Sequence, residues 1–206
     1  RVQATTRKPM LSQLLTSIID DIHGETITLR ELLERCGREG MLMVCAIACL
    51  PFLIPVSIPG VSTVFGAAIV LLAFALFLDR LPWLPQRILD KGMDAQKLKP
   101  VLHKGVNIVG KLERWLQSRM PALTTPAMQR FNSAVLVFGG LLLMAPLGLI
   151  PFSNTVPAVG ILLLTVGMMQ RDGLFVLLGY LGHILTVVYF GVLAYLAWIG
   201  GTLVLS

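Results

Sequence analysis

Residues 131–173 read FNSAVLVFGGLLLMAPLGLIPFSNTVPAVGILLLTVGMMQRDG, an apolar stretch interrupted by prolines and ended by an Arg-Asp pair. No charged residue occurs in this stretch before Arg171. A proline inside a helix removes a backbone hydrogen bond and breaks or kinks the helix. The stretch therefore predicts a helical hairpin whose arms, 131–150 and 158–170, meet at a Pro-rich tip, 151–157.

Residues 41–80 repeat this organisation, with arms at 41–54 and 61–78, a tip at 55–60 and a closing Asp79-Arg80 pair. Each half has an apolar arm, a proline break, a few small polar residues and a second apolar arm. Paired Pro-broken segments in corresponding halves of a chain point to a substrate site near the middle of a membrane transporter. Basic residues flank the base of both hairpins, which favours entry from the same side and leaves the choice between parallel and inverted repeats open.

The composition of the whole chain indicates a membrane protein. Its 206 residues are 55% hydrophobic and only 14% charged, and the mean hydropathy is +0.79. An average soluble domain has roughly 25% charged residues. A third uncharged run fills 173–206, and about 20 apolar residues suffice to cross a bilayer. We therefore expect an all-α polytopic membrane protein and exclude a soluble enzyme, a disordered chain and a secreted disulfide scaffold.

The number of membrane crossings stays open. As helices, the two arms of the first hairpin would be about 21 Å and about 27 Å long, against a hydrocarbon core of about 30 Å. Each hairpin therefore either barely spans the membrane or re-enters, with its tip inside. The last run would be about 50 Å long as one helix, so it forms one tilted helix or two short spans.

Positive charge is concentrated in one segment. The net charge is +6, residues 1–39 are neutral, and residues 79–130 carry ten basic and four acidic side chains. Basic loops remain in the cytoplasm, so we expect the N-terminus and residues 80–130 to be cytoplasmic. Such a segment attracts anionic lipid headgroups, and without interleaved aromatic residues it does not favour nucleic acid as a partner.

These patterns divide the chain into five segments. They are N-terminal amphipathic helices (1–40), a first hairpin (41–80), a basic segment with amphipathic helices (81–130), a second hairpin (131–173) and a C-terminal transmembrane stretch (174–206). Thr28 and Glu31 have the spacing of a capping box and predict a helix start. The three cysteines lack metal-ligand spacing and are expected to be reduced, packed thiols.

The hairpins supply the candidate substrate-binding residues. Broken helix ends expose unpaired backbone donors, which suit an anion such as a phosphate. The candidates are Ser57, Pro59, Gly60, Ser62 and Thr63 at the first tip, Ser153, Asn154, Thr155 and Pro157 at the second, and Asp79, Arg80, Arg171 and Asp172 at the bases. In the alternative interpretation, neighbouring helices satisfy the broken ends and the charged pairs only mark helix ends at the membrane interface.

Five motifs occur in order along residues 25–200. They are Ile-Pro-Gly at 58–60, Leu-Pro-Trp-Leu-Pro at 81–85, Leu-Glu-Arg at 112–114 followed by Arg119, Ile-Pro-Phe-Ser-Asn-Thr-Val-Pro-Ala at 150–158, and Arg-Asp-Gly at 171–173. Together they resemble the ExoD family of bacterial exopolysaccharide-synthesis proteins, although Val61-Ser62 departs from the small or Pro residue expected after the first motif. The resemblance implies a bacterial inner-membrane protein linked to exopolysaccharide production. Within it, Glu113, Arg114 and Arg119 are expected to make cytoplasmic contacts.

Two functions stay open. A transporter or flippase for an anionic or lipid-linked phosphate would use the broken hairpins, with membrane lipids and a polyprenyl-phosphate carrier as partners. An accessory protein of a polysaccharide synthesis complex would bind a synthase or polymerase. Gly179 and Gly182, with Gly191 nearby, would permit close contact between protomers of a possible homodimer.

Enzyme activity is not expected. The sequence contains no nucleophile elbow, metal-ligand pair or phosphate loop, so we expect no catalytic residue, metal or cofactor. His183 is isolated within an apolar stretch and is expected to be a packed, hydrogen-bonded group.

Overall fold

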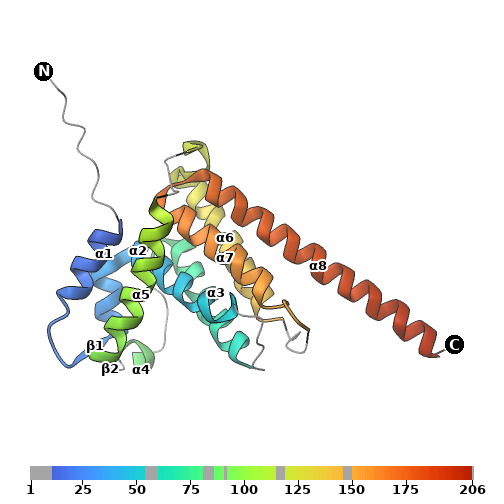
Figure 1. The fold of residues 1–206 in the computed structure, drawn as a ribbon, viewed down its shortest axis with the longest axis horizontal. Coiled ribbons are helices and arrows are strands. Elements are labelled where there is room, and N and C mark those ends of the chain that lie inside the picture. The colour runs from blue at the N-terminus through green and yellow to red at the C-terminus, as the bar shows by residue number, and fades with distance from the viewer. Residues whose placement is uncertain are drawn as a thin grey trace, which may run out of the picture.

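The computed structural model describes residues 11–53, 60–80, 86–90, 92–114, 119–145 and 150–205 (Figure 1). Most of this chain is helical, which confirms the predicted all-α class, while one short strand pair was not predicted. In order, the elements are α1 (Leu11–Asp20), β1 (Thr26–Thr28), α2 (Leu29–Cys49), the 3-10 helix η1 (Leu50–Leu53), α3 (Val61–Leu78), α4 (Gln86–Leu89), β2 (Gly92–Asp94), α5 (Ala95–Glu113), the 3-10 helix η2 (Pro121–Thr124), α6 (Pro126–Leu143), α7 (Thr155–Gln170) and α8 (Gly173–Leu205).

The strand pair joins two capped helices in the N-terminal part of the fold. β1 and β2 are antiparallel, with Ile27 opposite Met93. β1 leads into α2, where Thr28 and Glu31 make the predicted capping-box hydrogen bonds. β2 leads into α5, where the Asp94 carboxylate accepts hydrogen bonds from backbone N–H groups of the first turn. Each strand has three residues, which is too short for an alternating pattern to show in the sequence.

Helix α2 bends at Gly37, whose φ of 57° and ψ of −135° lie outside the helical region. The bend lies just before the uncharged run from Gly40 to Cys49, which forms the first arm of the first hairpin. Most of residues 41–49 are buried, because α7 and α5 pack against them. A Cβ on Gly105 of α5 would lie 2.9 Å from the Ile47 side chain. The first arm is therefore covered by protein.

The two hairpins pack with their tips at the same end. α3 lies against α6 and α2 lies against α7, so each arm meets the opposite arm of the other hairpin. Gly66, near the start of α3, touches Gly140, near the end of α6; a Cβ on Gly66 would lie 2.9 Å from the Gly140 carbonyl oxygen. Both glycines are close to the tips, which agrees with the same-side arrangement favoured by the basic flanks. The internal repeat itself stays a prediction.

The arms of the second hairpin differ from the predicted ranges. α6 begins at Pro126 and ends at Leu143, and α7 begins at Thr155 rather than Ala158. Pro157 lies inside the first turn of α7, where a missing backbone N–H removes no helical hydrogen bond. Pro157, which we predicted to belong to the Pro-rich tip, is therefore part of the first turn of α7.

The C-terminal stretch is the single helix α8, not two short spans. Its first half packs along α7, and its second half projects beyond the rest of the described chain (Figure 1). A Cβ on Gly179 or Gly182 would come within 2.8 Å of an α-carbon of α7. These two glycines serve a contact within the chain, so they are not available for the contact between protomers that we expected.

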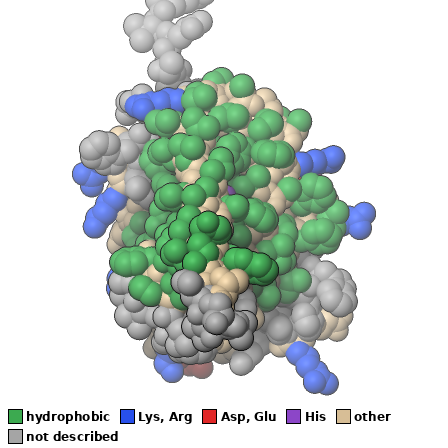
Figure 2. Space-filling view, turned by 90° about the vertical axis from the view of Figure 1, so that its right-hand side faces the viewer, with side chains coloured by type: hydrophobic (Ala, Val, Ile, Leu, Met, Phe, Trp, Pro, Cys, Tyr) green, Lys and Arg blue, Asp and Glu red, His purple; other side chains and the backbone are tan. Residues whose placement is uncertain are grey.

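Hydrophobic side chains cover one side of the molecule. α3, α6 and α8 expose large apolar residues, among them Phe74, Phe138 and Trp198. Seen toward the projecting end of α8, this surface is largely apolar, with Lys and Arg side chains at its margin (Figure 2). By length and composition, Val61–Leu78 and Gly173–Thr202 are able to cross a membrane, while α7 is apolar but shorter.

Gly66→Ala should destabilise the fold, because the new methyl group would collide with the backbone of α6. We expect the free energy of unfolding to fall by about 1–3 kcal/mol, the usual cost of overpacking. Gly191→Ala is the control, since nothing lies within 4 Å of its Cβ position. It should leave stability unchanged or raise it by up to about 1 kcal/mol. Thermal unfolding in detergent, followed by circular dichroism, measures both; equal melting temperatures would contradict the close α3–α6 crossing.

Candidate functional site

The second hairpin tip is a turn held against α8. Residues 151–154 form the turn, and α7 begins at Thr155. Phe152 has a left-handed backbone, with φ of 64°, and an exposed ring. The Tyr189 hydroxyl donates a hydrogen bond to the Pro151 carbonyl oxygen over 2.7 Å. This bond fixes the tip at the level of Tyr189 on α8.

Asn154 places a buried amide at the start of α7. Ser153, Asn154 and Pro157 are buried, and Thr155 is half-buried. Asn154 occupies the N-cap position, yet its side chain makes no capping hydrogen bond and its buried Nδ2 atom has no partner. Leaving a buried donor unpaired costs about 1–3 kcal/mol. The Val156 N–H already donates to the Phe152 carbonyl oxygen and Pro157 has no N–H. The Asn154 amide is thus the unused donor at the N-terminus of α7, where the helix dipole favours an anion.

The predicted residues of the first tip are only partly described. Ser57 and Pro59 lie outside the described residues. Gly60 is exposed, with φ of 85°, and directly precedes α3. In the first turn of α3, Ser62 is buried and Thr63 is exposed. The structure therefore takes Ser62 into the interior and leaves Gly60 and Thr63 on the surface.

The second arms of the two hairpins end in the same backbone conformation. Asp79 and Arg171 both have φ of 53°, and each closes its helix through its backbone N–H. Arg38 of α2 reaches the first of these ends, where Nη1 donates to the Leu76 carbonyl oxygen and to the Asp79 carboxylate, each over 3.4 Å. Its buried Nη2 atom has no partner. Asp79, Arg80 and Arg171 are exposed, so they remain accessible to a ligand.

Asp172 differs from these three charged residues because it is fully buried. Its carboxylate accepts a hydrogen bond from the Leu174 N–H over 2.9 Å and so caps α8. The neighbouring Gly173 N–H donates to the Arg119 carbonyl oxygen over 2.8 Å. Asp172 therefore has a structural role at the α7–α8 junction, and its contact with a substrate stays a prediction.

Basic residues gather on the outward face of α5. The exposed positions recur at helical spacing and include Lys97, Lys104, Lys111 and Arg114. A polar groove of about 710 Å³ lies between α1 and α5, and Ser12, Thr16, Asn107, Lys111 and Arg114 are among its lining residues. Of the expected cytoplasmic contacts, Arg114 lines this groove, Arg119 is exposed, and the side chain of Glu113 lies outside the described residues.

A buried polar cluster that sequence reasoning missed lies between α6 and α8. Asn132 donates through Nδ2 to the Leu123 carbonyl oxygen and accepts a hydrogen bond from the Tyr180 hydroxyl. His183 Nδ1 lies 2.7 Å from the Gly179 carbonyl oxygen, so this nitrogen carries the proton and donates. His183 is thus a packed, hydrogen-bonded group, as predicted. Asn132 is the one amide in the apolar arm 131–150, and this was the signal that could have pointed to it.

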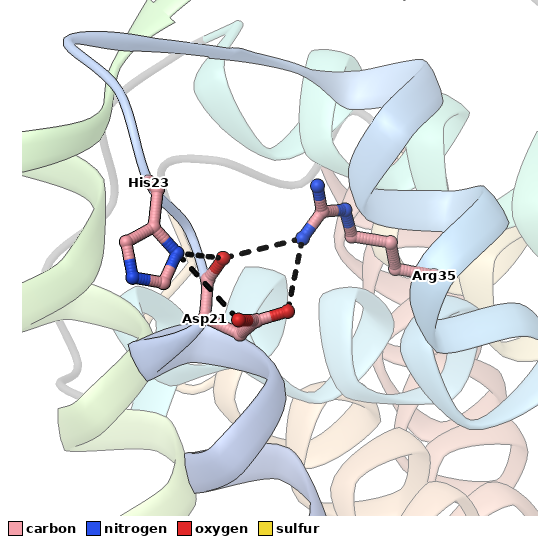
Figure 3. A network of polar contacts seen from close by, with 3 residues as sticks. All are labelled: Asp21, His23 and Arg35. Carbon is pink, nitrogen blue, oxygen red and sulfur yellow. Dashed lines mark hydrogen bonds and ion pairs between the residues drawn. The ribbon is translucent and has the colours of Figure 1, made fainter.

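A surface cluster ties α1 to α2 (Figure 3). His23 and Arg35 both contact the carbonyl oxygen and the carboxylate of Asp21. All three side chains are well exposed, and exposed ion pairs contribute at most about 1 kcal/mol. Within the described ranges, no group of three or more His, Cys, Asp or Glu could hold a metal ion. Cys45 and Cys49 are buried free thiols, as predicted.

Comparisons with known proteins identify relatives of this chain. A family model described as "Exopolysaccharide synthesis, ExoD" matches residues 11–192. Protein ExoD of Rhizobium meliloti is 55% identical over 192 residues, which are 93% of this chain and 80% of that protein. An uncharacterised protein of Synechocystis sp. is 27% identical over 184 residues, which are 89% of this chain and 86% of that protein. No solved structure matches.

Asp172→Ala should weaken the α7–α8 junction, because it removes the acceptor of the Leu174 N–H. We expect the free energy of unfolding to fall by about 1–2 kcal/mol. Asp172→Asn keeps a side-chain acceptor and should recover most of this loss. Thermal unfolding of both variants in detergent measures the difference, and identical losses for Ala and Asn would rule out capping as the role of this residue.

Proposed function

The chain belongs to the ExoD family of exopolysaccharide-synthesis proteins, and on that premise we propose that it is a multi-pass inner-membrane protein that moves a lipid-linked phosphate past its hairpin tips. Polysaccharide assembly uses polyprenyl-phosphate carriers that must be recycled across the membrane. The observation that carries the proposal is the buried, unpartnered amide of Asn154 at the start of α7.

The chemistry of this tip suits a phosphate. The N-terminus of a helix carries a partial positive charge and unpaired N–H groups, so it favours an anion. The Asn154 amide adds a donor that has no acceptor within the protein. Ser153 and Thr155 place hydroxyl groups on either side of it along the chain. A phosphate would bring the acceptor oxygen that the Asn154 amide lacks.

A membrane location is supported by the one-sided surface of the molecule. The exposed apolar residues of α3, α6 and α8 form a face that water would not cover favourably, so it needs lipid or protein against it. The part of the fold that contains α1, α5 and the strand pair exposes the basic residues of α5 on its outward side. On our proposal that part lies in the cytoplasm and contacts anionic headgroups.

The position of the second tip favours a re-entrant hairpin. At 1.5 Å per residue, Tyr189 lies about 24 Å along α8 from Gly173, less than a hydrocarbon core of about 30 Å. A hairpin whose base is at the membrane edge would thus end inside the membrane. α8 continues about 24 Å further, to Leu205, and would complete the crossing. Irregular backbone at such a depth needs a partner, and Tyr189 supplies one to Pro151.

A non-transporting accessory protein of a synthesis complex is the alternative. The projecting half of α8 favours it, because Tyr195, Leu196 and Trp198 are among the most exposed apolar residues there. In that case the helix would dock on a synthase or a second protomer, and the tips would be sealed against water.

Cysteine accessibility at the tips tests the proposal. In a version lacking Cys36, Cys45 and Cys49, single cysteines are placed at Asn154 and Ser57, and cells and inverted vesicles are treated with a charged thiol reagent. We expect labelling of Asn154→Cys that a soluble polyprenyl-phosphate analogue blocks. Ala158→Cys, one turn further along α7 and fully buried, should stay unlabelled. Absence of labelling at both tips from both sides would favour the accessory role.

Transport itself is measured in proteoliposomes. The purified protein should translocate a fluorescent polyprenyl phosphate, and Asn154→Ala should slow this by about tenfold, as expected for loss of one hydrogen bond to a charged group. A translocation rate equal to that of protein-free liposomes would overturn the proposal.

A further inference from the structure

An apolar groove of about 440 Å³ runs between α6 and α8 on the exposed hydrophobic side of the molecule. Its volume is in the range of ordinary small-molecule sites. One wall comes from the start of α6 and the other from the middle of α8. The lining residues are Phe131, Val135, Phe138, Tyr180, His183, Ile184, Val187 and Val188.

The groove offers hydrocarbon contacts and almost nothing else. Its two polar side chains use their donors inside the protein, since Tyr180 donates to Asn132 and His183 donates to the Gly179 carbonyl oxygen. The remaining nitrogen of His183, Nε2, occupies the space that a Cβ on Gly139 would take, so α6 covers it. An extended peptide in this groove would leave its backbone N–H and C=O groups without partners, which is costly in an apolar site. The groove therefore favours a hydrocarbon chain over an extended peptide.

Arg130 and Tyr189 do not line the groove, but each is the chain neighbour of a residue that does. At one end, Phe131 directly follows Arg130, whose side chain is exposed at the start of α6. At the other end, Val188 directly precedes Tyr189, which holds the second tip through Pro151. A chain lying in the groove would thus extend from a cation at the hairpin base toward the tip. The cation complements an anionic headgroup at the first end.

From this arrangement we infer that the groove binds the chain of a single-chain anionic lipid, with the phosphate at Arg130. The inference rests on the proposed function for the identity of the lipid, a polyprenyl phosphate. The groove leads such a lipid from the membrane edge to the tip, where the Asn154 amide lies. A chain bound here would stay in contact with the protein as its headgroup moved.

Filling the groove tests the inference. A photoreactive C20 polyprenyl phosphate is incorporated into nanodiscs with the full chain, and labelling of α6 and α8 peptides is quantified by mass spectrometry. Ile184→Trp should reduce this labelling by about tenfold, because the indole would occupy the space of the lipid chain. Leu185→Trp is the matched control: Leu185 is 60% exposed and Ile184 59%, but only Ile184 lines the groove. Equal labelling of the two variants would overturn the inference.

The contribution of the headgroup is tested separately. Arg130→Gln should reduce labelling by the phosphate about fivefold, the worth of one basic residue near an anionic headgroup, and should not affect the uncharged C20 alcohol. Loss of labelling with both probes, or with neither, would contradict a phosphate at Arg130. Cross-links between protomers through α6 and α8, in place of lipid labelling, would show that a second copy occupies the groove.

Failure of this inference and failure of the proposed function give different results. Specific labelling of the wild type without any translocation in proteoliposomes would retain the groove and reject transport. Translocation with Ile184→Trp at the wild-type rate, together with unchanged labelling, would reject the groove and retain transport.

Discussion

Helices α7 and α8 come so close at Gly160, Gly179 and Gly182 that their backbones touch, and the candidate site depends on this contact. A Cβ on Gly182 would lie 2.8 Å from the Gly160 α-carbon, so larger residues would push the helices apart. The His183 ring fits between α7 and α6, beside Gly139 and Gly160. With α7 and α8 separated, Tyr189 would no longer reach Pro151, and the second tip would lose the bond that holds it.

Other helices cover the two sides of the hairpin bundle unequally. The first arm, in the second half of α2, is packed between α5 and α7, whereas α3 and α6 expose apolar residues on the opposite side. An amphipathic helix thus covers one side of the bundle and leaves the other for lipid or protein. Among the described helices, α3 and α8 have the length and composition to cross a membrane, and both contribute to the uncovered apolar side.

Two of the candidate site residues, Asn154 and Asp172, differ in the partners that the fold gives them. Asn154 directly precedes α7, and Asp172 directly precedes α8. The two residues therefore occupy similar positions at helix starts but have different partners. Asn154 keeps an unused donor, while the Asp172 carboxylate is an acceptor in a helix cap. The groove between α6 and α8 lies on the uncovered side and adjoins the tip through Tyr189.

The sequence by itself determined the helical class, the start of α2 at the Thr28 capping box, the full extent of α3 and the buried thiols, because these depend on local spacing, absence of charge and side-chain type. It also placed the start of the second tip at Pro151, but misread Pro157 as a break, since proline ends a helix only beyond the first turn. The tertiary structure alone decided the β1–β2 pair, the covering of α2 by α5, the burial of Asp172 and the link from Asn132 to Tyr180. The physical reason is that each of these requires residues distant in the chain to meet, and packing, rather than local pattern, selects such partners.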